Sequence, residues 1–424
     1  MSVDTLTTIT QQDLDKILNN HARFLSGKPG GARASLKDQD LSGLNFEGAN
    51  LSQSDFTGCS FCGANMKGVS FASATLFGCD MSQCALQNAN FSRADLRGTD
   101  IQLSDLTNAD FSKADLRTGS SVAKHKQNKD LYGRVGEGRV TFNGSIMTNA
   151  NFKDANALMA DFSDALLENA DFSRANLQKS IMSGANLSNA EFDGADLRSA
   201  DFMAANLTGA HMVNNEKSGA SFELSLTDDG LEDEVALSPD ELISKHEQWV
   251  QTSGREGEKM DISHYDLRRL KSLAGRRLTA IHAKHSVFAT LNMQGVEMQS
   301  VCMPSADFRE ADMRHADMRG SDLTSSVFVR TNLKNVDCRP LVIKGPKDDR
   351  SIPCDFRQAI FRFCDASGGK FCHADFSGCD LTQANFSNTD LSHANFTGAI
   401  LDAVHFEGAN LENAVFDPDY SFEE

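Results

Sequence analysis

The sequence predicts an all-β solenoid, in which short strands coil around a core that every turn of the chain helps to fill. Large apolar residues recur at every fifth position over most of the 424 residues, a period that fits neither an α-helix nor an ordinary strand. The same residues sort into columns of like side chains at a spacing of 20. Two short segments with helical periodicity interrupt the repeat.

The five-residue period is clearest between Leu36 and Leu116. All 17 positions reached by steps of five are apolar, an outcome that composition alone would give roughly once in several million trials. A small residue such as Ala49 stands two places before most of them, with Gln39 and Leu44 as exceptions near the start. Asp or Asn usually lies between the two classes. The repeated unit therefore reads small, Asp or Asn, large apolar, polar, polar.

The pattern returns in blocks at 142–212, 278–333 and 356–416. Runs such as Ala-Asp-Phe-Ser-Arg and Ala-Asn-Leu-Thr-Gly match the consensus A-(D/N)-L-x-x, so the chain resembles the pentapeptide-repeat family. The resemblance implies a right-handed quadrilateral β-helix with four units per coil. It also implies that the large apolar residue and the small residue before it both point inward.

Residues 20 apart must stack if four units make one coil, and the sequence tests this independently. One column of the second block holds Phe142, Phe162 and Phe202, and the neighbouring column holds Leu167 and Leu187. Phe-rich and Leu-rich columns alternate in the last block as well. The spacing of 20 was not part of the consensus, so it supports four-sided coils.

Segments 11–26 and 238–253 carry apolar residues at helical spacing. The second opens with Ser-Pro-Asp-Glu, which suits an N-cap followed by Pro at the first helical position. The segments also match each other, because His21 precedes Phe24 just as His246 precedes Trp249. We therefore expect a tandem duplication, with a short α-helical cap before each half.

The chain divides accordingly into two halves, each consisting of a cap and two repeat blocks separated by an insert. Whether the halves form one continuous rod or two jointed solenoids stays open. The predicted segments are a helical cap at 1–35, β-helix at 36–117, a basic insert loop at 118–140, β-helix at 141–214, an acidic linker at 215–237, a second helical cap at 238–261, β-helix at 262–338, a basic insert loop at 339–353, β-helix at 354–416 and an acidic tail at 417–424.

The two inserts break the repeat and concentrate positive charge in an acidic chain. Loops that project from a rigid scaffold often carry function, so we predict that the inserts contact a protein partner. A second interpretation, that they are merely tolerated insertions, stays open because long surface loops cost little. The candidate contact residues are Lys124, Lys126, Lys129, Arg134, Arg139, Lys344, Lys347 and Arg350.

Motifs argue against catalysis. The sequence holds no phosphate-binding Gly loop, nucleophile elbow or zinc pattern. His373 and His393 are the best metal candidates, but no convergent ligand set accompanies them, so we expect an exposed ladder. His21 and His246 should form helix-to-coil hydrogen bonds, and cysteines at small inward positions, such as Cys59, should fill the core. We expect no enzyme activity, no cofactor and no metal site.

Charge and hydropathy limit the partners and the compartment. The net charge of −18 disfavours electrostatic binding to nucleic acid. No apolar run reaches the ~18 residues of a membrane span, and the start lacks a signal-peptide pattern. We therefore expect a cytoplasmic protein with reduced cysteines and with neither a nucleic-acid nor a membrane partner.

These observations favour a non-enzymatic scaffold or interaction module that binds a protein partner of unknown identity through solenoid faces and inserts. The resemblance implies an alternative, because some family members, including quinolone-resistance proteins, mimic DNA with an acidic rod and bind DNA gyrase. Block 262–353 carries a net charge of +5, which does not suit a duplex mimic. A third alternative is self-association, as a homodimer or an end-to-end homopolymer.

Overall fold

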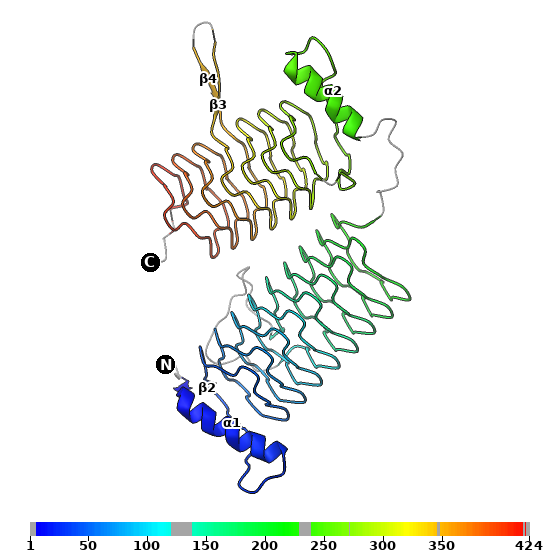
Figure 1. The fold of residues 1–424 in the computed structure, drawn as a ribbon, viewed down its shortest axis with the longest axis vertical. Helices are drawn as coiled ribbons and strands as arrows, with labels where there is room; N and C mark the ends of the chain where they lie inside the picture. The colour runs from blue at the N-terminus through cyan, green and yellow to red at the C-terminus, as the bar shows by residue number, and fades with distance from the viewer. Residues whose placement is uncertain are drawn as a thin grey trace. The chain divides into compact units, whose positions relative to one another are not determined.

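The structure is a computed structural model that describes residues 6–119, 138–228, 239–270, 272–345, 348–418 and 420. The chain forms two compact units, Met1–Asp228 (unit 1) and Asp229–Glu424 (unit 2). The five-residue repeat, wound into solenoid coils, makes up most of the described chain in each unit (Figure 1). The named elements are β1 (Thr7–Thr8), α1 (Gln11–Leu25) and β2 (Gln39–Asp40) in unit 1, and α2 (Pro239–Gln251), β3 (Leu341–Ile343) and β4 (Arg350–Ile352) in unit 2.

Successive coils are joined by short parallel bridges between residues 20 apart, and each coil carries four of them. Parallel stacking of one coil on the next is the arrangement of a β-helix solenoid, so the predicted solenoid is confirmed. Bridges of one coil in unit 1 are Asn45–Asn65, Asn50–Ser70, Asp55–Thr75 and Ser60–Asp80.

The two inserts leave this ladder intact. Asp100 pairs with Thr141 across the first insert, and Asp322 pairs with Asp355 across the second. Each insert therefore leaves the solenoid at a corner and returns at the same corner, so the coils on either side stack as if the insert were missing.

Most five-residue units close a tight turn. The Ala49 N–H donates to the Phe46 carbonyl at 2.9 Å, and Gly48 between them has a φ of 66°. A positive φ is what the third residue of a type II turn requires. Many non-glycine residues adopt the same conformation at this place, for example Gln53 with a φ of 64°. The two polar positions of the repeat are thus turn positions.

The Asp or Asn of the repeat also has a structural role. Asn50 Oδ1 accepts a hydrogen bond from the Ser52 N–H at 3.1 Å, and Asp80 Oδ1 accepts one from the Ser82 N–H at 3.1 Å. Such Asx turns satisfy a backbone donor at the outer surface. The repeated carboxylates are therefore explained by turn formation.

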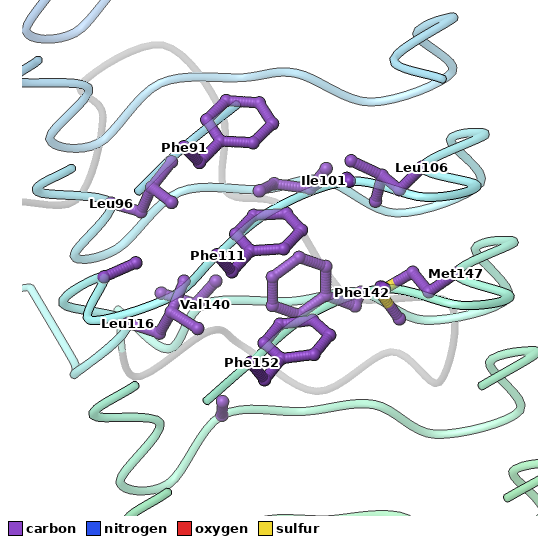
Figure 2. Close-up of a cluster of buried hydrophobic side chains, with 14 of the residues drawn as sticks. Phe91, Leu96, Ile101, Leu106, Phe111, Leu116, Val140, Phe142, Met147 and Phe152 are labelled. Atoms are coloured by element: carbon purple, nitrogen blue, oxygen red, sulfur yellow. The ribbon is translucent and has the colours of Figure 1, made fainter. Parts of the chain in front are cut away.

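Aromatic columns fill the core of unit 1 (Figure 2). The rings of Phe91, Phe111 and Phe152 stack nearly parallel, with centroids 4.9 and 4.8 Å apart, and Phe172 continues the column at 4.8 Å. Phe142 meets Phe152 edge-on at 5.9 Å. Each fully buried Phe contributes about 1.5–3 kcal/mol through apolar burial. Because every ring depends on the coils above and below it, no coil is stable alone.

Helix α1 packs against the first coil of unit 1. Leu14 is fully buried there, and the Gln11 side-chain amide bonds both the N–H and the carbonyl of Asn45 at 2.9 and 3.0 Å. Strand β1 pairs in parallel with β2, with Thr7 opposite Gln39. Side chains of α1 and the strand β1 thus meet backbone groups that a preceding coil would otherwise bond.

Helix α2 packs against the first coil of unit 2 in a related way. Ile243 is 1% exposed within the core, and the Glu247 carboxylate accepts hydrogen bonds from the Arg277 N–H at 3.1 Å and from Arg276 Nε at 2.8 Å. Both helices begin and end close to the boundaries that the sequence predicts.

Unit 1 extends beyond the predicted boundary at 214. Glu216, Ser221 and Leu226 form bridges with the preceding coil, and the Phe222 ring stacks on Phe202 at 5.0 Å. Residues 215–226 therefore belong to the coil rather than to an acidic linker. The polar Lys at position 217 occupies a large apolar place and hides this coil from the sequence pattern.

Within the described residues, no helix is both long and apolar enough to cross a membrane.

Candidate partner-binding site

The second insert, which the sequence predicts to be a loop, contains a β-hairpin. Strands β3 and β4 pair antiparallel, with Leu341 opposite Ile352 and Ile343 opposite Arg350. Figure 1 shows the hairpin projecting from the coils of unit 2. The apolar run Leu-Val-Ile followed by Gly345 is a strand and turn signal that could have predicted it.

The hairpin exposes apolar and basic side chains together. Val342 is 56% exposed and Ile343 is 48% exposed, which is unusual for aliphatic residues in this chain. Lys344 and Arg350 are exposed beside them near the end of the hairpin. Asp348 and Asp349 are exposed there too, so charges of both signs flank an apolar centre, as in a small protein-binding surface.

The root of the hairpin is tightly packed on the solenoid. Gly320 has a φ of 66°, and a Cβ added there would lie 2.5 Å from Leu341 Cβ. Cys338 and Cys354 are fully buried on either side of the insert. Burial and the neighbouring Cys354 thiol raise the pKa of Cys338 well above its usual value. Close packing at this corner fixes where the hairpin leaves the coil.

Arginine–aspartate pairs flank the root. Arg319 contacts Asp317 at 2.7 Å, and Arg339 contacts Asp337 at 2.7 Å. The hydrogen bond that Arg339 donates to the Asp337 carboxylate raises the pKa of Arg339, and the Asp337 charge adds to the rise. Because Arg319 and Arg339 each have a carboxylate partner, neither adds uncompensated positive charge at the root of the hairpin.

The root of the first insert is described in part. The Gly119 N–H donates to the Gly138 carbonyl at 2.7 Å, so the two ends of the insert meet. A Cβ on Gly98 would lie 3.3 Å from Gly119 Cα, which leaves little room for a side chain beneath the insert. Arg97 covers the Phe77 ring at 5.3 Å beside this root.

Three of the eight predicted contact residues lie in the described chain. Lys344 and Arg350 share the hairpin of unit 2, and Arg139 lies half-buried at the root of the first insert in unit 1. The other five, Lys124, Lys126, Lys129, Arg134 and Lys347, lie outside the described residues. Val342 and Ile343 lie outside the predicted set, which contains only charged residues of the inserts.

The histidine candidates do not assemble a metal centre. His373 and His393 stack with centroids 4.6 Å apart and an interplanar angle of 3°, forming the predicted exposed ladder. In the part of the chain that the structure describes, no group of three or more His, Cys, Asp or Glu side chains is placed to hold a metal ion.

The other singled-out residues have structural surroundings. His21 Nε2 lies 3.0 Å from the Ser52 carbonyl, and His246 Nε2 lies 3.0 Å from the Thr279 carbonyl, so both form the predicted helix-to-coil hydrogen bonds. Cys59 is 1% exposed, and burial raises its pKa to about 12. A thiol with so high a pKa is a poor nucleophile, which suits core filling.

Comparison with known proteins identifies the repeat. The family model for pentapeptide repeats matches in eight copies, at residues 32–68, 45–83, 84–118, 139–169, 170–209, 303–337, 354–378 and 379–417. A comparison with curated proteins gave no match.

Several solved structures are similar over parts of the chain. QnrB1, a plasmid-mediated fluoroquinolone resistance protein, is 21% identical, with 46% of this chain and 94% of QnrB1 covered and a TM-score of 0.27. HetL of the cyanobacterium Nostoc, a pentapeptide repeat protein involved in heterocyst differentiation regulation, is 16% identical, with 92% and 93% covered and a TM-score of 0.12. A pentapeptide repeat protein of the Arabidopsis thaliana thylakoid lumen is 28% identical, with 35% and 75% covered and a TM-score of 0.15.

The family assignment rests on the repeats themselves. Matched segments cover more than half of the chain, and the coils, turns and aromatic columns follow the five-residue unit. The chain therefore belongs to the pentapeptide-repeat family.

Proposed function

We propose that this chain is a non-enzymatic scaffold that binds a protein partner, with the β3–β4 hairpin as its main contact in unit 2. The exposure of Val342 and Ile343 carries the proposal, because aliphatic side chains at the end of a projecting hairpin remain in water unless a partner covers them. Lys344 and Arg350 would form the polar rim of that contact.

The proposal is tested by replacing the apolar side chains while keeping the hairpin. Val342→Thr and Ile343→Thr preserve β-propensity and remove apolar area. Ile146→Thr, at a 39% exposed position in unit 1, is the matched control. We expect a partner captured by the intact protein to be lost with the double hairpin variant and kept with the control. Equal capture by both variants would reject the hairpin as the contact.

The DNA-mimic alternative is weaker for a reason of charge. Carboxylates of the first coils of unit 2 are paired with arginines. Arg314 lies 2.6 Å from Asp312, and Arg309 pairs with Asp307. A duplex mimic needs a sustained row of uncompensated negative charge. Inhibition of DNA supercoiling by purified gyrase at submicromolar protein would overturn our preference for the scaffold.

A second candidate function, self-association, is favoured by the last coil of unit 2. Leu401 and Leu411 occupy large inward positions but are only partly buried, whereas Leu381 and Leu391 one coil earlier are fully buried. Val415 is 52% exposed on the same coil. A last coil whose apolar residues are partly exposed is an edge that can pair with another. Sedimentation over a concentration series should show association that Leu411→Lys abolishes, and a concentration-independent monomer would reject it.

We further infer a right-handed quadrilateral coil, a tandem duplication of the two units, and a capping role for α1 and α2. The helix-to-coil bonds of His21 and His246 support the duplication, because their acceptors Ser52 and Thr279 follow equivalent large residues. Counted in repeat units from these helices, the two inserts leave their solenoids at corners that are one unit apart. We therefore infer that the inserts entered the chain after the duplication. An experimental structure with the opposite handedness would refute the first of these inferences.

A further inference from the structure

A buried histidine joins α1 to two separate parts of the first coils in unit 1. His21 is 0% exposed. Its Nδ1 accepts a hydrogen bond from the Ala34 N–H at 3.0 Å. Because Nδ1 accepts, the proton of the neutral ring lies on Nε2, which donates to the Ser52 carbonyl at 3.0 Å. Only the neutral imidazole can make both bonds.

The same arrangement occurs in unit 2. His246 is 0% exposed, its Nδ1 accepts from the Met260 N–H at 3.1 Å, and its Nε2 donates to the Thr279 carbonyl at 3.0 Å. The ring also stacks on Trp249, with centroids 5.6 Å apart and an interplanar angle of 19°. Two independent helices are thus held on their coils by one neutral imidazole each.

The charged surroundings of the two rings also match. Arg33 directly precedes Ala34, and Lys259 directly precedes Met260, so a cation stands next to each backbone donor. Burial lowers the pKa of His21, the Ser52 carbonyl opposes this, and Arg33 lowers it further.

The balance is similar around the second ring. Burial lowers the pKa of His246, the Thr279 carbonyl raises it, Lys259 lowers it again, and Glu247 on the same helix opposes Lys259. The surroundings of both rings therefore favour the neutral form on balance.

We propose that His21 and His246 make the docking of α1 and α2 acid-sensitive. A proton bound at Nδ1 removes the lone pair that accepts the Ala34 or Met260 N–H, so two N–H groups then face each other across the buried contact. The protonated ring regains its hydration when the helix leaves the coil. Release would uncover the first coil of each unit, whose edge is otherwise bonded by the helix.

The direction and size of the effect follow from linkage. The docked imidazole has a pKa below its usual 6.5, while the released imidazole titrates near 6.5. Docking is therefore fully favoured above about pH 6.5 and weakens as pH falls, until the docked ring is itself protonated. Between pH 7.5 and pH 5.5 the ratio of docked to released helix should fall, by at most about tenfold, the limit that titration of the released ring alone would set.

Trp249 is the only tryptophan of the chain and reports on α2 directly. Its fluorescence, recorded between pH 7.5 and 4.5, should show a transition with a midpoint below 6.5. His246→Gln can keep a donor near the place of Nε2, and His246→Asn can keep an acceptor near the place of Nδ1. Neither amide titrates in this range, so both variants should abolish the transition. Lys259→Gln should move the midpoint to higher pH. His282→Gln is the matched control, because His282 contacts Lys259 at 3.1 Å without touching the helix, and it should retain the transition.

Hydrogen exchange keeps the test decisive if a variant does not fold. After correction for intrinsic rates, amides of α1 and α2 in the unaltered chain should exchange faster at pH 5.5 than at pH 7.5, by up to about tenfold, relative to interior coils. Helices that stay as protected as the coils, or a fluorescence transition unchanged in both His246 variants, would overturn the proposal. No partner is needed, so the outcome is independent of the scaffold proposal.

Discussion

Phe152 lies at the centre of the aromatic core of unit 1, and its removal should destabilise the unit strongly. The side chain is 0% exposed, stacks on two rings at 4.8 Å each and meets Phe142 and Phe162 edge-on at 5.9 and 5.5 Å. Truncation of a buried Phe to Ala costs about 3–5 kcal/mol. Lost aromatic pairs, each worth about 0.5–1.5 kcal/mol, place Phe152→Ala at the upper end of that range.

The matched comparison is Phe222→Ala at the end of the same unit. Phe222 is only partly buried and stacks on Phe202, so its loss should cost about 1–2 kcal/mol. Urea unfolding followed by circular dichroism measures both variants, and Trp249 fluorescence reports on unit 2 as an internal control. Equal costs for the two variants, or an equal shift of the Trp249 transition, would refute a stack stabilised by contacts between neighbouring coils.

Three further predictions concern the hairpin root, the carboxylates and the thiols. Gly320→Val should destabilise the root by about 2–3 kcal/mol, since a side chain meets both a left-handed φ and Leu341; faster proteolysis between β3 and β4 would show it. The hydrogen bond that Arg314 donates to Asp312 holds the pKa of Asp312 below 3.8. The pair should therefore stabilise the fold by under about 1 kcal/mol above pH 3.8, and this stabilisation should vanish at lower pH. Asp312→Asn should remove this pH dependence of unfolding. Cys59 should resist thiol reagents at pH 8 until the chain unfolds, and labelling of the native protein would contradict its burial.

The repeat made most of the fold predictable, because the residue type at each position of a unit reflects whether that position is buried or exposed. Phe142 and Phe162 are apolar since both face a filled core, and their spacing of 20 already contained the coil length. The two helices were equally visible, because His21 and His246 recur within matching apolar patterns. Periodic burial along the chain produces a periodic pattern of apolar residues in the sequence.

Irregular features were less visible. Unit 1 continues past 214 although Lys at position 217 replaces a large apolar residue, because end coils have fewer neighbours and tolerate polar substitutions. The exposed Val342 and Ile343 were not predicted as contact residues, because the predicted set contains only charged side chains. The bonding of Asp95 to Arg97 two residues later depends on turn geometry, which a consensus of five letters does not contain.

The unbroken bridge from Asp100 to Thr141 has a consequence for how such a chain acquires new functions. Both ends of an insert are held at a corner of the solenoid, so doubling its length adds only about 0.6 kcal/mol of loop-closure entropy. New segments can therefore be tried at a corner without disturbing the Phe111–Phe152 stack that passes beneath. The corners of the solenoid are therefore sites at which evolution or an engineer can exchange an inserted segment and leave the stacked coils unchanged.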